Sequence, residues 1–488
     1  MSCSASTSRT GHLSVASIGV PPSSTEVTAV VVLLIAQFMA NMDTSIANLA
    51  TPSIGASLRA NGIGQQWVVA AYVLTSAMFM ITVARLSTVL GDRSVFLSGI
   101  AVFTLASLAC GLAPTIAVLI AARGVQGIGA AMMVGQVLSG IKFRLQGEAL
   151  TRAISAYTVA LSLSAAVGQV AGGAIVTANF FGTSWRPLFV LNVPIGVALL
   201  AVALWRMDNR GRSTSRAAFD VWGAIILAIA MLMCVVPLNL GFAFGWPPWA
   251  IASLIVSAAA LVAFTLRERN LLAGGGLPLI DLRLFSVPGA SAGLTAMAIT
   301  RIVFFSLIFV MALYLQTGLH KSAFESGLSL LTWMVAYGVS GPVYPIVPRR
   351  FLGLVPAAGC LIVAATFCGL AALHGTGGVF VTLLGIAGFA FGLLSTGLVN
   401  HLAETVSVEL SANLSGLLAT MVPLTAAIGV ATFGSIYLTQ TAGSKSDAAS
   451  ASFAYLCVLF GAAFVLAAVA SAVAMKERFT RSNHAGPG

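Results

Sequence analysis

Long apolar segments recur along nearly the whole sequence, and they constrain the fold more than any other feature. Each segment is about 20 residues long, the length of α-helix that crosses the hydrocarbon core of a bilayer. Of the 488 residues, 58% are hydrophobic and only 8% are charged, whereas about a quarter of residues are charged in soluble domains. The sequence therefore predicts an all-α integral membrane protein, with spans at 28–50, 66–88, 95–113, 115–138, 153–176, 187–206, 219–241, 248–266, 290–316, 325–347, 353–373, 376–398, 412–438 and 453–474.

Two polar connections, 206–220 and 267–285, divide these fourteen expected spans into six, two and six. This layout predicts two parallel six-helix bundles joined by an inserted helical hairpin. A fourteen-helix bundle without internal repeats is the alternative. The expected organisation is a disordered cytoplasmic tail at 1–27, an N-terminal bundle at 28–206, links and hairpin at 207–285, a C-terminal bundle at 286–474 and a cytoplasmic tail at 475–488.

The distribution of positive charge predicts the orientation in the membrane. The net charge is +11, and 18 of the 24 Lys and Arg residues fall on the side that also holds both termini. Because Lys and Arg are enriched in cytoplasmic loops, both termini are expected to be cytoplasmic in a cell membrane. The charge is therefore explained by topology, and we expect lipid as the surroundings, no nucleic-acid partner and a monomeric protein.

No motif for an enzyme or an ATP-driven pump is present in the sequence. A phosphate-binding loop ends in Gly-Lys followed by Ser or Thr, and none of the four lysines here follows a glycine. The sequence also has no His-Glu-x-x-His metal helix and no Gly-x-Ser-x-Gly nucleophile turn. We expect no cofactor and no metal, so a transporter would use an ion gradient, and a passive conduit is the other possibility.

Three charged residues lie inside the expected spans: Asp43, Arg123 and Arg301. A charge at the centre of a bilayer costs about 3 kcal/mol on insertion scales, so it normally faces a partner or a watery cavity. These residues are therefore the first candidates for function. Counting about 1.5 Å per helical residue places Asp43 and Arg123 at similar depths, where they could meet, and Arg301 near the middle of the membrane.

Two motifs surround the first two of these charges. Residues 119–131, LIAARGVQGIGAA, include Arg123, Gln126, Gly127 and Gly129 on one span. Residues 38–52, FMANMDTSIANLATP, include Asp43. The first segment resembles the fourth-span motif of major facilitator transporters, and the second resembles the first-span signature of their fourteen-span drug:proton antiporter family.

This resemblance implies the major-facilitator fold and a proton-coupled exporter, with Asp43 and Arg123 in proton coupling. It extends to QWVVAAYVL at 66–74, WRPLFVLNVPIG at 185–196, LRLFSVPG at 282–289 and YLQTGL at 314–319. Two structural alternatives remain from the residues alone. Arg123 could snorkel to the membrane interface, and Asp43 could form a salt bridge that only stabilises the fold.

The first span also carries a polar stripe that predicts a substrate-binding surface. At about 100° per residue, the stripe is centred about 140° away from Asp43, so the two cannot both face one cavity. Its side chains are Gln37, Asn41, Thr44, Ser45 and Asn48. The expected substrate contacts are Asn41, Thr44, Ser45, Asn48, Gln126 and Arg301. Two arginines against one carboxylate favour neutral, zwitterionic or carboxylate-bearing substrates, although Arg301 could instead pair with the carbonyl end of a helix.

Two further motifs predict close helix packing and conformational roles. Gly168, Gln169, Gly172 and Gly173 in the fifth span resemble the antiporter motif of this family, with Gln169 where proline is usual, and ordinary small-residue packing explains them equally well.

The loop after the second span keeps Gly91 and Arg93, but Thr88 stands at its usual acidic position and Asp92 at a usually basic one, which leaves open whether the charge-paired latch forms. Asp92 could instead pair locally with Arg85 or Arg93. His401, Glu404 and Glu409 are expected in a solvated cytoplasmic connection.

The resemblance and the embedded charges favour export of small organic compounds against a proton gradient. An antibiotic or secondary-metabolite exporter that also gives self-resistance is the preferred interpretation. A broad multidrug pump, an importer of the same fold and a non-transporting membrane sensor or scaffold are the alternatives. The altered loop at Thr88 slightly favours the last of these.

Overall fold

The computed structural model describes residues 23–179, 182–207, 220–242, 244–276, 278–373, 377–407, 410–441 and 446–484. Within these ranges the chain is helical, with short connections and no strand. Thirteen of the described helical segments are long and apolar enough to cross a membrane. The protein is therefore a multi-pass membrane protein, as the recurring apolar segments predict.

The helices of the first part of the chain follow the expected spans closely. They are α1 Ser24–Leu58, α2 Gly62–Leu90, α3 Asp92–Gly111, α4 Ile116–Val134, α5 Val137–Arg144, α6 Gly147–Ala178, α7 Arg186–Val190 and α8 Asn192–Arg206. The helix α1 begins at Ser24, before the expected end of the N-terminal tail at residue 27. Ser23 is its capping residue and forms a reciprocal capping box with Glu26.

The inserted hairpin consists of α9 Val221–Leu240 and α10 Pro248–Ala273. The C-terminal part contains η2 Leu282–Ser286, α11 Ala290–Leu313, η3 Tyr314–Gly318, α12 Ala323–Val343, η4 Tyr344–Ile346, α13 Arg349–Leu352, α14 Val355–Ala372, α15 Gly378–Thr405, α16 Ser411–Gly429, η6 Val430–Gly434, α17 Ser435–Thr441 and α18 Ser446–His484. The helix α12 coincides with the expected span 325–347, but it is not among the thirteen apolar segments.

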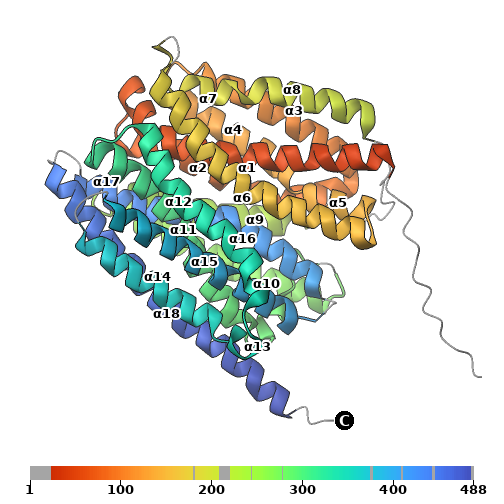
Figure 1. Cartoon of the computed structure of the whole chain (residues 1–488). Helices are drawn as coiled ribbons and strands as arrows, with labels where there is room; N and C mark the ends of the chain where they lie inside the picture. The colour runs from red at the N-terminus through yellow and green to blue at the C-terminus, as the bar shows by residue number, and fades with distance from the viewer. Residues whose placement is uncertain are drawn as a thin grey trace, which may run out of the picture.

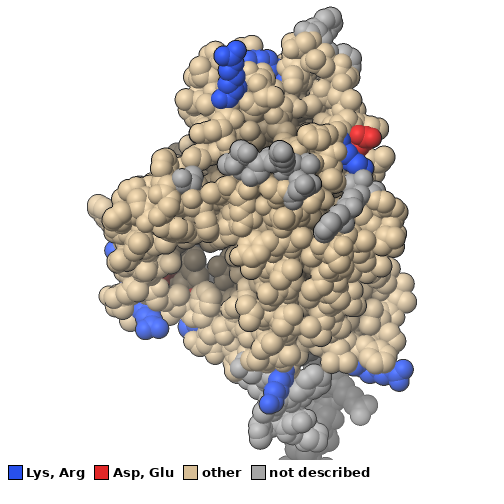
Figure 2. Space-filling view, turned by 90° about the vertical axis from the view of Figure 1, so that its left-hand side faces the viewer, with Lys and Arg blue, Asp and Glu red and all other residues tan. Residues whose placement is uncertain are grey.

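The two groups of helices lie side by side, with α1, α3, α4 and α8 in one group and α14, α15 and α18 in the other (Figure 1). Their axes diverge toward the end of the molecule where α1 begins and α18 ends, which we call the terminal end (Figure 1). Figure 2 shows the molecule from the left-hand side of Figure 1, opposite the terminal end, and this face is mostly uncharged, with Lys and Arg in a few separate places.

Glutamine side chains connect the two groups at the end opposite the terminal end. Gln66 of α2 donates hydrogen bonds to the carbonyls of Val430 (2.5 Å) and Ala431 (3.0 Å), both in the π-helix η6. Gln316, in the π-helix η3, donates to the carbonyl of Leu49 in α1 (3.0 Å). A π-helix leaves some carbonyls outside the regular α-helical pattern of hydrogen bonds. Gln66 supplies a donor to two carbonyls of this kind, those of Val430 and Ala431.

Candidate functional site

Asp43 and Arg123 form an ion pair inside the N-terminal group of helices. Asp43 comes from α1 and Arg123 from α4, and the two residues are 1% and 0% exposed. The structure thus brings together the two charges that depth arithmetic placed at one level. Arg123 is part of the protein interior and does not snorkel to an interface.

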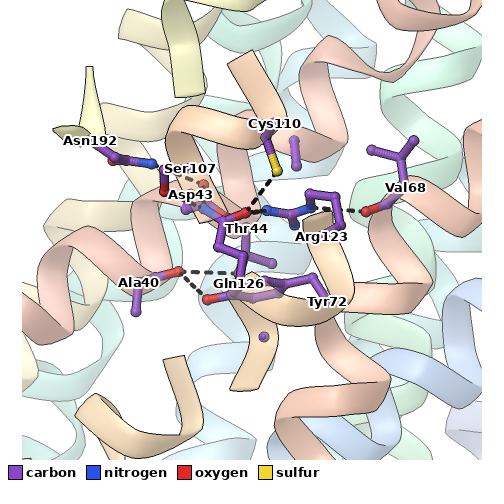
Figure 3. Close-up of polar contacts among 12 residues, drawn as sticks. Ala40, Asp43, Thr44, Val68, Tyr72, Ser107, Cys110, Arg123, Gln126 and Asn192 are labelled. Carbon is purple, nitrogen blue, oxygen red and sulfur yellow. Dashed lines mark hydrogen bonds and ion pairs between the residues drawn. The ribbon is translucent and has the colours of Figure 1, made fainter. Parts of the chain in front are cut away.

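Neutral polar side chains complete the surroundings of the Asp43 carboxylate. Gln126 donates to Asp43 Oδ1 at 2.8 Å, and Asn192 of α8 donates to the same oxygen at 3.0 Å. Asn192 and Arg123 approach Asp43 from opposite sides (Figure 3). Gln126 also lies 2.8 Å from Ser107 Oγ and accepts from Arg123 Nη1 at 2.7 Å. Both oxygens of Asp43 are therefore held by donors from two helices, α4 and α8.

Arg123 has two further contacts that fix its orientation. Its Nε donates to the carbonyl of Val68 in α2 at 3.0 Å. Its guanidinium carbon lies 4.2 Å from the ring centroid of Tyr72, also in α2 (Figure 3). The Tyr72 hydroxyl donates to the carbonyl of Ala40 at 3.1 Å. Tyr72 also lines the central cavity, so its ring separates that cavity from the ion pair.

Glycines allow the helices that carry this network to approach closely. A Cβ at Gly127 would lie 2.4 Å from the carbonyl of Tyr72, and one at Gly129 would lie 2.6 Å from the amide of Phe103. Such distances are too short for any side chain, so these positions require glycine for α4 to pack on α2 and α3.

A central cavity of about 380 Å³ lies on the other side of α1. The polar stripe faces it, with Gln37, Asn41, Thr44, Ser45 and Asn48 among the lining residues. Asp43, on another face of α1, is not among the residues that line the cavity. The opposite wall comes from the C-terminal group and includes Arg301 and several aromatic side chains. Arg301 is the one charged residue among the described residues that line the cavity.

Arg301 has no hydrogen bond or ion pair with any residue in the described part of the chain, and its side chain is half-buried at the cavity wall. Among the described residues, Arg301 therefore does not pair with the carbonyl end of a helix. A guanidinium remains charged at any physiological pH. It therefore gives the cavity a positive charge that the lining residues do not balance.

Gln126 differs from its expected role. It is fully buried and bonded to Asp43, Arg123 and Ser107, and it does not line the cavity. Its amide is a donor to one member of the ion pair and an acceptor for the other. Gln126 is therefore part of the charge network and not a substrate contact.

The fifth-span motif lies where α6 meets α1 and α12. A Cβ at Gly168 would be 3.0 Å from the carbonyl of Met42, and one at Gly172 would be 3.3 Å from Ile46 Cγ1. One at Gly173 would be 2.6 Å from the carbonyl of Ala323 in α12. Gly168 and Gly172 therefore allow α6 to pack on α1 within the N-terminal group, and Gly173 allows it to pack on α12 of the C-terminal group.

Gln169 of the same motif is fully buried. Neither polar atom of its side chain has a partner among the described residues. The proline that is usual at this position would present no such atoms.

The connection between α2 and α3 carries the loop motif. Gly91 has φ +87° between α2 and α3, and Arg93 donates to the carbonyl of Leu204 in α8 at 2.9 Å. The side chains of Arg85 and Thr88 lie outside the described residues.

The expected solvated position of His401 is wrong. It is 2% exposed, because α15 continues to Thr405 and packs His401 near Gly289 and Gly293. Glu404 is exposed, and Glu409 lies outside the described residues.

Three residues of the network were missed by reasoning from the sequence: Tyr72, Ser107 and Asn192. Tyr72 and Asn192 lie in segments that matched the family pattern, 66–74 and 185–196, without a role being assigned to them. A polar side chain within an apolar span was the available signal, since such groups need a partner in the membrane. That signal indicates a partner but does not identify it.

Comparisons with known proteins identify the family of the chain. Residues 33–430 match the family model described as Major Facilitator Superfamily. The chain is 31% identical to a probable actinorhodin transporter of Streptomyces coelicolor, over 88% of this chain and 76% of that protein. It is 32% identical to a cephamycin export protein of Amycolatopsis lactamdurans, over 88% of each chain.

A multidrug resistance protein, Stp, of Mycobacterium tuberculosis is 28% identical over 82% of this chain and 73% of its own length. Among solved structures, a bacterial homologue of the human lysosomal transporter Spinster, inward-facing and unoccupied, superposes with a TM-score of 0.70. That likeness covers 94% of this chain and 98% of the other at 14% identity, which shows the fold. The family match extends over most of the sequence, and the chain therefore belongs to the Major Facilitator Superfamily.

Proposed function

We propose that this protein is a proton-coupled antiporter that exports small organic compounds, in particular an antibiotic or secondary metabolite of the organism that makes it, and so gives self-resistance. The names of two relatives, an actinorhodin transporter and a cephamycin export protein, support this class of substrate. We also propose fourteen spans with both termini cytoplasmic, α12 being the span that the apolar count leaves out. The helical grouping supports a six, two and six division.

The observation that carries the proposal is the placement of a buried ion pair directly behind a central cavity. Thr44 faces the cavity, and Asp43 faces Arg123. Protonation of Asp43 would remove the charge that Arg123 neutralises, and a buried arginine without its partner is costly. The packing of α1 against α4 would then change, and the cavity wall formed by α1 would change with it. This is a physical route from proton binding to substrate binding.

Substrate would bind between the polar stripe of α1 and the wall that contains Arg301. The stripe offers amide and hydroxyl groups through Asn41, Thr44, Ser45 and Asn48. No described lining residue carries a negative charge, so the cavity does not compensate a cation. We therefore expect neutral, zwitterionic or carboxylate-bearing substrates.

Transport into everted membrane vesicles tests the proposal. Vesicles with an acidic interior should accumulate substrate, and a protonophore should abolish the accumulation. Uptake in the reverse direction, into right-side-out vesicles, would identify an importer. No transport in either direction, together with a copurifying partner protein, would support a sensor or scaffold.

A broad multidrug pump is the second candidate. The relative Stp is named a multidrug resistance protein, and most of the cavity wall is apolar, which tolerates different ligands. Resistance profiles of a pump-deficient host separate the two candidates. Protection against many unrelated compounds indicates a multidrug pump, whereas protection against one chemical class indicates a dedicated exporter.

A further inference from the structure

The wall of the cavity opposite α1 combines one unpaired cation with a group of aromatic rings on neighbouring turns. Arg301, Phe304, Phe305 and Ile308 of α11 all line the cavity. Their spacing of three, four and seven residues places them on one face of the helix. The Cβ atoms of residues three or four apart lie about 5–6 Å from each other. The cation and the nearest rings are therefore within reach of one small ligand.

The aromatic part of this wall is held in place by packing. Phe304 stacks on Phe391 with ring centroids 5.0 Å apart and an angle of 22° between the planes. Its centroid is 5.8 Å from that of Tyr337 and 6.1 Å from that of Trp333. Phe391 and Trp333 are fully buried behind Phe304, whereas Tyr337 also lines the cavity. A ring fixed in this way offers stacking contact with little loss of side-chain entropy on binding.

We infer that the cavity selects aromatic acids, meaning compounds whose acidic group lies on, or within one or two bonds of, a planar aromatic ring. The acid binds Arg301, and the ring packs against Phe304, Phe305 and Tyr337. Arginine forms charge-assisted hydrogen bonds with carboxylates, and aromatic pairs gain contact energy beyond burial alone. The inference rests on the proposed function, whose cavity it uses, and it names the substrate class of that cavity.

The opposite wall adds a preference for hydroxyl groups. Asn41 and Thr44 line the cavity, are partly exposed to it and carry an amide and a hydroxyl group. Amide and hydroxyl oxygens accept hydrogen bonds, so they can bind a hydroxyl donor on the far side of the ligand. The ligand is therefore a planar acid on one side and a hydrogen-bond donor on the other.

Equilibrium binding to the purified full-length protein in nanodiscs, without a proton gradient, tests the inference. The probes are anthracenecarboxylate, the uncharged anthracenecarboxamide, and adamantanecarboxylate as an aliphatic acid of similar bulk. Fluorescence anisotropy follows the two anthracenes, and adamantanecarboxylate is measured by its competition with them. We expect anthracenecarboxylate to bind about tenfold or more tightly than the carboxamide, a difference typical of one good charged contact. It should bind about two- to tenfold more tightly than adamantanecarboxylate, the gain expected from aromatic contact.

Two substitutions separate the contributions of charge and ring. Arg301→Gln should remove the preference for acid over amide, and Arg301→Lys should keep much of it. Phe304→Leu should reduce the preference for anthracene over adamantane and leave the preference for acid over amide unchanged. The surface pair Arg350 and Phe351 supplies matched controls, because its guanidinium lies 4.7 Å from an exposed ring outside the cavity. Arg350→Gln and Phe351→Leu should leave all three affinities unchanged.

Equal binding of the acid and the amide to the wild-type protein would overturn the inference, even if a variant fails to fold. Retention of the acid preference in folded Arg301→Gln would do the same. The proposed function fails separately. If vesicles show no proton-driven export while the three affinities differ as expected, the cavity selects aromatic acids in a protein that is not an exporter. If export occurs but the affinities are equal, only the inference fails.

Discussion

Asp43 and Thr44 are adjacent in the sequence but face different environments, since Asp43 is bonded to Arg123 in the protein interior and Thr44 lines the central cavity. The helix α1 therefore separates the charge pair from the cavity. A proton taken up at Asp43 would act on substrate through movement of α1 and not through direct contact. Tyr72, which touches both sides, is the residue through which the two are most directly connected.

Asp43→Asn is expected to abolish pH-driven export in everted vesicles, because it removes the group that would bind the coupling proton. The buried Arg123 would also lose its only charged partner among the described residues. Breaking a buried ion pair from one side costs about 3–5 kcal/mol, so the thermal midpoint should fall as well. Wild-type rates of proton-driven export in this variant would rule out Asp43 as the coupling group.

Arg123→Lys should be nearly as inactive as Arg123→Ala. The arginine uses Nη1 for Asp43 and Gln126 and Nε for the carbonyl of Val68, and a lysine amine cannot reproduce this fork. The double variant Asp43→Asn with Arg123→Gln should regain much of the stability without regaining transport, because it leaves no unpaired charge. A double-mutant cycle on the thermal midpoint checks this, and additive effects would contradict the direct contact.

The positions of the spans could be predicted because the length and apolarity of a segment decide whether it crosses a bilayer. Contact between Asp43 and Arg123 could be predicted from helical rise, and the cavity-facing stripe from helical phase. The end of α15 could not be predicted, because apolarity falls before the helix ends. The sequence therefore predicts a solvated His401, whereas this residue is buried. The bond between Gln66 and Val430 joins residues 364 positions apart, and no pattern in one sequence pairs them.

Tyr72→Leu is expected to reduce proton-coupled export strongly, because the ring under Arg123 is lost. Tyr72→Phe keeps the ring and loses only the hydrogen bond to Ala40, which is worth about 1 kcal/mol, so it should retain most activity. The measurement is the number of protons exchanged per substrate in proteoliposomes. Tyr157→Leu is the control, because Tyr157 lines the cavity and forms no hydrogen bond with the network in the described part of the chain. Its substrate affinity should change while its proton stoichiometry stays the same.

The base of the inserted hairpin should be stabilised by a pH-dependent contact. Burial raises the pKa of Asp220, but hydrogen bonds from Arg267 and from the amide of Gly223 outweigh it and hold the pKa below the ordinary value. The stabilisation is therefore complete above the unfolded pKa of about 3.9 and is lost as pH falls through the lower folded pKa.

Asp220→Asn should accordingly lower the thermal midpoint at pH 7, and the difference from wild type should shrink as the pH falls below about 4. Thermal unfolding in detergent at several pH values measures this difference. A difference that is independent of pH would contradict the role of the ionised carboxylate.

Gln66 is expected to keep the two groups of helices closed at the end opposite the terminal end. Gln66→Leu removes its bonds to the carbonyls of Val430 and Ala431 and leaves these buried groups of the π-helix η6 without that donor. The hydroxyl of Ser435 lies 3.0 Å from Gln66 Oε1 and 3.1 Å from the carbonyl of Asn239 in α9, so the contact also reaches the inserted hairpin. Losing it should shift the equilibrium toward a form that is open at this end.

Distances between spin labels measure the shift, with labels at Ala56→Cys and Lys321→Cys in a background without native cysteines. Ala56 and Lys321 lie at the same end, one in each group of helices, and line a shared surface pocket. Gln66→Leu should increase the population with longer distances. Gln65→Leu is the matched control, because among the described residues the side chain of Gln65 donates only to Ala60 within its own group (3.3 Å), and it should leave the distribution unchanged. Identical distributions for the two variants would mean that Gln66 does not hold this end closed, and the glycine contacts between α6 and α12 would then be the stronger closure.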